Sequence, residues 1–126
     1  MLADRRAHAV LPTGDVDALR PFYEEVLGFT PHAVLASGVA YRAGDGSLFV
    51  ISRSAGISTG AFTQIGFTVP DIEAEVAELR GRGVVFEEYE APKTEGGIAR
   101  MPVGRAAWFR DPAGNLLVIV QFDQGF

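Results

Sequence analysis

The chain of 126 residues contains no cysteine. Without a thiol it cannot form disulfides, thiolate metal sites or a cysteine nucleophile, so disulfide-rich secreted scaffolds and zinc ribbons are excluded. A chain of this length needs neither, because it can bury roughly two-thirds of its unfolded surface. The composition therefore predicts an ordinary globular protein stabilised by a hydrophobic core.

Positive charge and long apolar runs are also scarce. Eleven Lys and Arg residues stand against sixteen Asp and Glu, which gives a formal net charge of −5. This balance argues against nucleic acid or an anionic membrane as the main partner and suits a cationic or neutral ligand. The longest strongly aliphatic run is residues 116–120, and the N-terminus has no apolar segment typical of a signal peptide. We expect a cytoplasmic protein that binds neither nucleic acid nor membranes.

The sequence does contain an internal repeat. The segments AHAVLPTGDVDALRPFYEEVLGF and TQIGFTVPDIEAEVAELRGRGVVF both show an apolar stretch, a turn, an aspartate, an amphipathic helical pattern and a glycine. Asp15 and Asp71, 56 positions apart (71 − 15), are placed to cap the two helices. Gly28 is placed to end the first helix, and Gly81 or Gly83 the second.

Strand-like segments follow each expected helix. They are separated by turn-forming residues and span residues 30–35, 39–42 and 48–52 in the first half and 84–89, 106–110 and 116–122 in the second. Residues 91–105 are predicted to form a long loop, and the Ser/Gly-rich residues 53–61 a linker. The pattern predicts an α+β protein, a single domain of residues 1–126 with a βαβββ unit at 6–53 and another at 62–122.

This arrangement resembles the vicinal oxygen chelate superfamily, which includes glyoxalase I, extradiol dioxygenases, fosfomycin-resistance enzymes and bleomycin-binding proteins. The resemblance covers residues 7–122 and rests on a His-x-x-x-x-x-Gly-Asp opening, a Phe-Tyr-x-x-x-Leu-Gly-Phe helix end and a Phe-x-Asp-Pro-x-Gly-Asn turn. It implies that the two units form a curved mixed sheet around a cleft. It also implies a homodimer, with the cleft formed within one chain or across two.

Metal-dependent members of that superfamily place one ligand on the first and one on the fourth strand of each unit. The matching positions here are His8, Val50, Gln64 and Val118. Valine has no donor atom, whereas Zn²⁺, Fe²⁺ or Mn²⁺ needs at least three donors. We therefore expect no cofactor and no family-type metal site, with a divalent metal as the less favoured alternative.

Strand alternation predicts which side chains share the cleft face with these positions. The expected cleft is mainly apolar with a few polar groups, as small-molecule sites usually are. Trp108 is a candidate for stacking on a planar ligand, and Arg105 for binding a carboxylate or phosphate, although core packing and a solvated loop position are the alternatives. The predicted ligand-binding residues are His8, Val50, Ser52, Gln64, Thr68, Arg105, Trp108 and Val118.

Two functions remain compatible with the sequence. The favoured one is a glyoxalase/bleomycin-resistance-like protein that binds a small molecule in its apolar cleft without a metal, as a resistance or sequestration protein. The alternative is a glyoxalase- or dioxygenase-like lyase, isomerase or oxygenase with an altered metal site or cofactor-free acid–base chemistry. In that case His8 is the only candidate catalytic residue.

Overall fold

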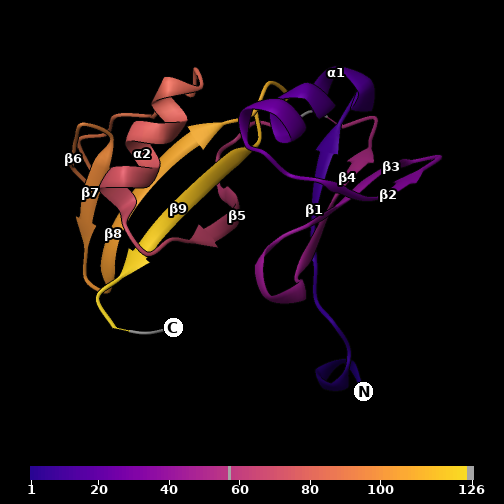
Figure 1. Cartoon of the computed structure of the whole chain (residues 1–126), viewed down its shortest axis with the longest axis horizontal. Coiled ribbons are helices and arrows are strands. Elements are labelled where there is room, and N and C mark those ends of the chain that lie inside the picture. Colours follow the sequence, from indigo (N-terminus) through magenta and orange to yellow (C-terminus); the bar gives the residue numbers. More distant parts are fainter. Residues whose placement is uncertain (57, 125–126) are drawn as a thin grey trace. The chain divides into compact units, whose positions relative to one another are not determined.

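The computed structural model describes residues 1–56 and 58–124 (Figure 1). The chain divides into two compact units, Met1–Ser58 and Thr59–Phe126, each built around its own sheet and helix. The predicted α+β class is confirmed. The strands form two mixed sheets, one of four strands and one of five. None of the helices in the described part of the chain is long and apolar enough to span a membrane.

The first unit contains four strands in the spatial order β1-β4-β3-β2. β1 runs parallel to β4, and the other neighbouring pairs are antiparallel. Its elements are β1 (Ala9–Thr13), α1 (Val16–Pro21) with a following π-helical turn (Phe22–Val26), β2 (Pro31–Leu35), β3 (Gly38–Arg42) and β4 (Leu48–Arg53), with short 3-10 turns at Leu2–Asp4 and Gly44–Gly46.

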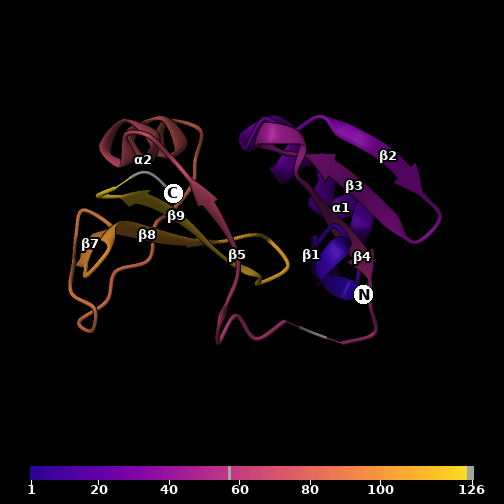
Figure 2. The same ribbon diagram turned by 90° about the horizontal axis from the view of Figure 1, so that it is seen from below.

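The second unit repeats this topology with one extra strand. The order is β5-β9-β8-β7-β6, with β5 parallel to β9, so in both units the first strand lies beside the last (Figure 2). The elements are β5 (Thr63–Thr68), α2 (Ile72–Gly81), β6 (Thr94–Glu95), β7 (Ile98–Met101), β8 (Gly104–Arg110) and β9 (Leu116–Phe122).

Both helices begin at the predicted aspartates. The Asp15 carboxylate accepts a hydrogen bond from the amide of Ala18 at 3.1 Å, and Asp71 accepts from Ala74 at 3.2 Å. Each cap satisfies an amide that has no partner within its helix. Pro21 has no amide hydrogen to donate, and it marks the point where α1 gives way to the π-helical turn.

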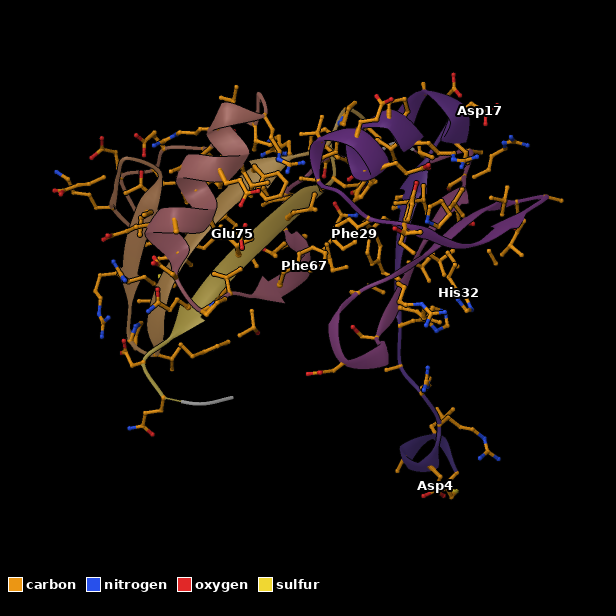
Figure 3. All side chains as sticks on the ribbon, viewed as in Figure 1. Asp4, Asp17, Phe29, His32, Phe67 and Glu75 are labelled. Atoms are coloured by element: carbon orange, nitrogen blue, oxygen red, sulfur yellow. The ribbon has the colours of Figure 1, made fainter. Side chains whose placement is uncertain are left out.

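The core of each unit lies between its sheet and its helix. In the first unit four aromatic rings form a cluster, with ring centroids 4.9–6.5 Å apart: Tyr23, Phe29, Tyr41 and Phe49. In the second unit, Leu117 and Ile119 of β9 are buried. Phe67 of β5, labelled in Figure 3, is half-buried and is paired with Ile119.

The sequence interpretation was wrong in one region of the second unit. Residues 84–89 form no regular strand; Phe86 makes only an isolated bridge to Phe109, and the amide of Glu87 donates to the carbonyl of Trp108. The neighbouring position beside β8 is taken by β7, which lies in the segment expected to be a loop. β6 and β7 form a hairpin through Gly96 and Gly97, which have φ values of 58° and 81°.

In both units the backbones of two neighbouring strands approach closely at one glycine, at the start of β3 in the first unit and of β8 in the second. Gly38 begins β3 and Gly104 begins β8. A Cβ at position 38 would overlap the carbonyl oxygen of Ile51, and one at position 104 would overlap that of Gln121. Only glycine fits these two positions without moving the adjacent strand.

Candidate ligand-binding site

Each sheet has one face covered by its helix and one face that the helix does not cover. Leu11, Phe49 and Leu117 on the covered faces are at most 1% exposed, whereas Val10 on the other face is 56% exposed. Val50 and Val118 are half-buried. Because successive side chains in a strand point to opposite faces, this burial agrees with the alternation expected from the sequence.

The first unit contains a hollow of about 390 Å³ that brings together two predicted site residues, His8 and Val50. The residues come from the chain before β1, the Gly44–Gly46 turn and the start of β4. Parallel pairing of β1 with β4 places these segments at the same end of the sheet. The lining consists of Arg6, Ala7, His8, Asp45, Gly46, Ser47, Leu48 and Val50.

Some polar side chains of the hollow already form hydrogen bonds within the protein, and others do not. Arg6 Nη1 donates to the Gly46 carbonyl at 3.3 Å, and Ser47 Oγ donates to the Gly44 carbonyl at 2.6 Å. The side chains of His8 and Asp45 are exposed and make no hydrogen bond or ion pair with the described residues. These two groups are therefore accessible to a ligand.

Ser52 lies farther along the uncovered face of the first sheet. It is paired with Pro12 of β1 and Gly38 of β3, two residues beyond Val50, and is half-buried. It does not line the hollow that contains His8 and Val50. Ser52 thus lies on the expected face of the sheet but outside that hollow.

On the second sheet, Trp108 and Val118 lie side by side on the uncovered face. Val118 is paired with Gly66 on one side and Trp108 on the other, and the neighbouring Val120 is paired with Thr68. The surface combines half-buried apolar side chains with the exposed Thr68 and Gly66.

The orientation of Trp108 is set by two neighbours. Its Nε1 donates to Thr63 Oγ1 at 3.2 Å, and its ring meets Tyr89 edge-on, with centroids 5.6 Å apart. Burial, and secondarily the Glu87 carboxylate, raise the pKa of Tyr89. Tyr89 therefore stays neutral at physiological pH and provides an uncharged edge beside the indole.

Gln64 has a structural role in this chain. Its Nε2 donates to Asn115 Oδ1 at 3.0 Å, and its Oε1 accepts from the amide of Leu116 at 3.2 Å. Asn115 is fully buried and donates to Asp111, whose other oxygen accepts from two backbone amides of the turn. The Gln64 side chain thus joins β5 to the turn before β9.

Arg105 lies on the face of the second sheet opposite Trp108. Its Nη1 forms an ion pair with Glu73 of α2 at 2.8 Å, and its Nη2 donates to Gln121 at 3.2 Å. Its register partner is Gln121, whereas Trp108 pairs with Val118. The structure therefore does not bring Arg105 together with the other predicted ligand-binding residues of this unit.

The four positions matched to the superfamily's metal ligands do not fit a divalent cation. Val50 and Val118 have no donor atoms, and both polar atoms of the Gln64 amide are hydrogen-bonded within the second unit. Across residues 1–56 and 58–124, no group of three or more His, Cys, Asp or Glu side chains is arranged to hold a metal ion. The side chains at the four positions therefore do not support the metal-based chemistry of the superfamily.

Three polar side chains of the hollow were not identified from the sequence: Arg6, Asp45 and Ser47. The Gly-Asp-Gly pattern indicates a turn, but the pattern alone does not show that this turn lies beside Arg6. That neighbourhood depends on the parallel β1–β4 pair, in which each residue of β1 lies beside one 40 positions later in the chain, such as Val10 beside Val50.

Comparisons with known proteins place this geometry in a family. Among solved structures, an antibiotic-binding protein from Streptomyces sp. CB03234, TnmS3, is 23% identical with a TM-score of 0.72, covering 95% of this chain and 98% of its own. A bleomycin resistance determinant encoded on transposon Tn5 is 22% identical with a TM-score of 0.73, covering 95% and 99%. The oxidase ChaP-H2 is 21% identical with a TM-score of 0.70, covering 96% and 95%.

These similarities show a shared fold. No curated protein matches the chain. The model of the Glyoxalase/Bleomycin resistance protein/Dioxygenase superfamily matches residues 5–119, which is most of the chain. The chain belongs to the glyoxalase/bleomycin resistance protein/dioxygenase superfamily.

Proposed function

We propose that this protein binds a small aromatic molecule without a metal and acts by sequestering it. The observation that supports this most directly is the position of its single tryptophan, Trp108. The indole is half-buried on the uncovered face of the second sheet, beside the apolar Val118 and on the face that also carries the polar Thr68. An apolar surface with an aromatic wall and a few polar groups is the usual composition of a small-molecule site.

The family gives this proposal a functional context. Two structures of the same fold are named as an antibiotic-binding protein and a bleomycin resistance determinant. The net charge of −5 favours attraction of cationic molecules. A homodimer in the cytoplasm, as expected from the family resemblance and composition, is part of the same proposal.

Sequestration is favoured over catalysis because two of the four positions that would hold a metal are valines without donor atoms, and a third, Gln64, is hydrogen-bonded within the second unit. The alternative, an enzyme that uses the exposed His8 for proton transfer, is distinguished by the fate of the ligand. A binding protein releases it chemically unchanged after denaturation. Conversion of the ligand, abolished by His8→Ala, would instead support the enzyme.

The test is a thermal-shift screen with bleomycin and a panel of aromatic cations and neutral aromatic metabolites, followed by titration of tryptophan fluorescence. Stacking against the indole contributes about 0.5–1.5 kcal/mol beyond area burial. Trp108→Leu should therefore weaken binding about two- to tenfold by calorimetry, and Trp108→Phe, which retains a ring, should weaken it less. The proposal fails if ligands bind without changing the fluorescence and Trp108→Leu binds them as well as the parent.

A further inference from the structure

We propose that the hollow in the first unit binds the carboxylate of a small aromatic or aliphatic acid, with Arg6 as the binding residue. This deepens the proposed function, on which it rests for the premise that the ligand is a small molecule. It concerns a different unit from Trp108 and a residue that neither the repeat nor the family motifs singled out. Two features support it: the state of the Arg6 guanidinium and the lining of the hollow. The local charge then provides a test of the sign of the ligand's charge.

Arg6 is held at the hollow with most of its hydrogen-bonding capacity unused. A guanidinium has five N–H donors, and the structure shows one bond, at 3.3 Å, to the carbonyl of Gly46. Within the described residues Arg6 has no carboxylate partner. Other arginines do form ion pairs with carboxylates: Arg20, Arg82, Arg100, Arg105 and Arg110.

The remaining lining suits the rest of such a ligand. The exposed imidazole of His8 supplies a second polar contact, and the side chains of Leu48 and Val50 supply an apolar floor. A volume of about 390 Å³ accommodates one or two rings carrying a carboxylate. A guanidinium pairs with a carboxylate through two parallel N–H···O bonds, so Arg6 would orient the acid as well as attract it.

Local charge, rather than the net charge of the chain, decides what this hollow accepts. Residues 1–58 contain five arginines against six acidic residues, so most of the negative charge lies in the second unit. Within the hollow, Asp45 opposes Arg6. Asp45 weakens the attraction for any anion, and its removal is therefore a sensitive test of the sign of the ligand's charge.

The experiment uses three probes that share one ring system: 2-naphthoate, the neutral 2-naphthamide and the cation 2-naphthylmethylammonium. Their dissociation constants are measured by two-dimensional NMR, following the backbone amides of residues 6–8 and 46–50. The variants are Arg6→Gln, Asp45→Asn and, as matched control, Arg5→Gln. Arg5 is also exposed and is next to Arg6 in the chain, but it does not line the hollow.

Naphthoate should bind about tenfold more tightly than naphthamide, as expected for a charge-assisted pair. Arg6→Gln should remove that advantage, Arg5→Gln should preserve it, and Asp45→Asn should increase it about two- to fivefold. Three results would overturn the proposal: equal affinity for acid and amide, equal effects of the two arginine substitutions, or no binding of naphthoate at millimolar concentration. Preference for the ammonium probe, lost in Asp45→Asn, would overturn it as well.

Failure here and failure of the proposed function are distinguishable. The proposed function is tested by tryptophan fluorescence and by Trp108→Leu, both of which report on the second unit. If Arg6→Gln has no effect while Trp108→Leu weakens binding, only the carboxylate site is refuted. If Trp108→Leu weakens the binding of no ligand of the screen but Arg6→Gln weakens the binding of naphthoate, the proposed stacking on Trp108 is refuted. The hollow then remains a binding site.

Discussion

Glu24 connects the helical segment of the first unit to its sheet through one buried hydroxyl. Tyr41 is fully buried and donates to Glu24 Oε2 at 2.8 Å, while Arg20 Nε donates to the same oxygen at 2.6 Å. The hydrogen bond from Arg20 lowers the pKa of Glu24. Burial, followed by the hydrogen bond to Glu24, raises the pKa of Tyr41. Glu24 therefore stays charged, and Tyr41 neutral, over a wide pH range.

Glu24→Ala should destabilise the protein by about 1–3 kcal/mol, because a buried tyrosine hydroxyl loses its acceptor. Tyr41→Phe, which removes the hydroxyl together with its need for a partner, should cost only about 0.5–1.5 kcal/mol. Urea unfolding measures both. Glu25→Ala at the exposed neighbouring position is the control and should stay within about 0.5 kcal/mol. Equal losses for Glu24→Ala and Glu25→Ala would contradict this role.

The same carboxylate predicts a pH dependence of stability. Because the pKa of Glu24 is lower in the folded state than in the unfolded chain, the unfolded state binds more protons as the solution is acidified. The contribution of Glu24 is fully present at neutral pH and is lost as the pH falls from about 5 through the folded-state pKa. The stability difference between the parent and Glu24→Gln should therefore shrink on acidification. A difference independent of pH between 7 and 3 would refute the linkage.

At the scale of the element, the turn before β9 depends on a buried polar chain that runs from Gln64 through Asn115 to Asp111. Asn115→Ala should cost about 2–4 kcal/mol in urea unfolding, since Gln64 and Asp111 each lose a partner. Hydrogen exchange at the Leu116 amide, which is bonded to Gln64, should accelerate as well. Pro112→Ala, an exposed position in the same turn, is the control. A similar small effect of both substitutions would show that the network contributes little.

Elements that are determined by residues adjacent in the chain could be predicted from the sequence. Elements that depend on which of two segments pairs with a given strand could not. The caps at Asp15 and Asp71 and the bounds of β9 follow from residues adjacent in the chain. Residues 84–89 have the alternation of a strand, with Val85 exposed between buried neighbours, yet β7 occupies the place beside most of β8. The Gly96-Gly97 pair is a hairpin signal that would have revealed β6 and β7.

The candidate site shows the same division. Alternation along a strand correctly separated Val50 and Val118 from the core residues, because it requires only the period of two. It could not show that the Gln64 amide is engaged by Asn115, 51 residues away, or that Arg6 reaches Gly46. Those contacts depend on strand pairing between distant parts of the chain.

For the whole molecule, the donor chemistry of the four family positions predicts that the purified protein contains no stoichiometric transition metal. Two of the positions are valines, and Gln64 is hydrogen-bonded within its own unit. Elemental analysis of protein prepared without chelator should give well under one Zn, Fe, Mn or Ni per chain. About one metal per chain, lost in His8→Ala, would show that a site with different ligands exists.

The two glycines that begin β3 and β8 limit which sequences the fold accepts. In a deep mutational scan, Gly38 and Gly104 should be depleted of every substitution, alanine included, because even a methyl group would meet the neighbouring strand's carbonyl oxygen. Gly44 and Gly81, where nothing lies within 4 Å of the same methyl, should accept alanine. The two intolerant positions correspond across the repeat, so they are a steric signature by which diverged copies of this unit can be aligned when their side chains no longer match.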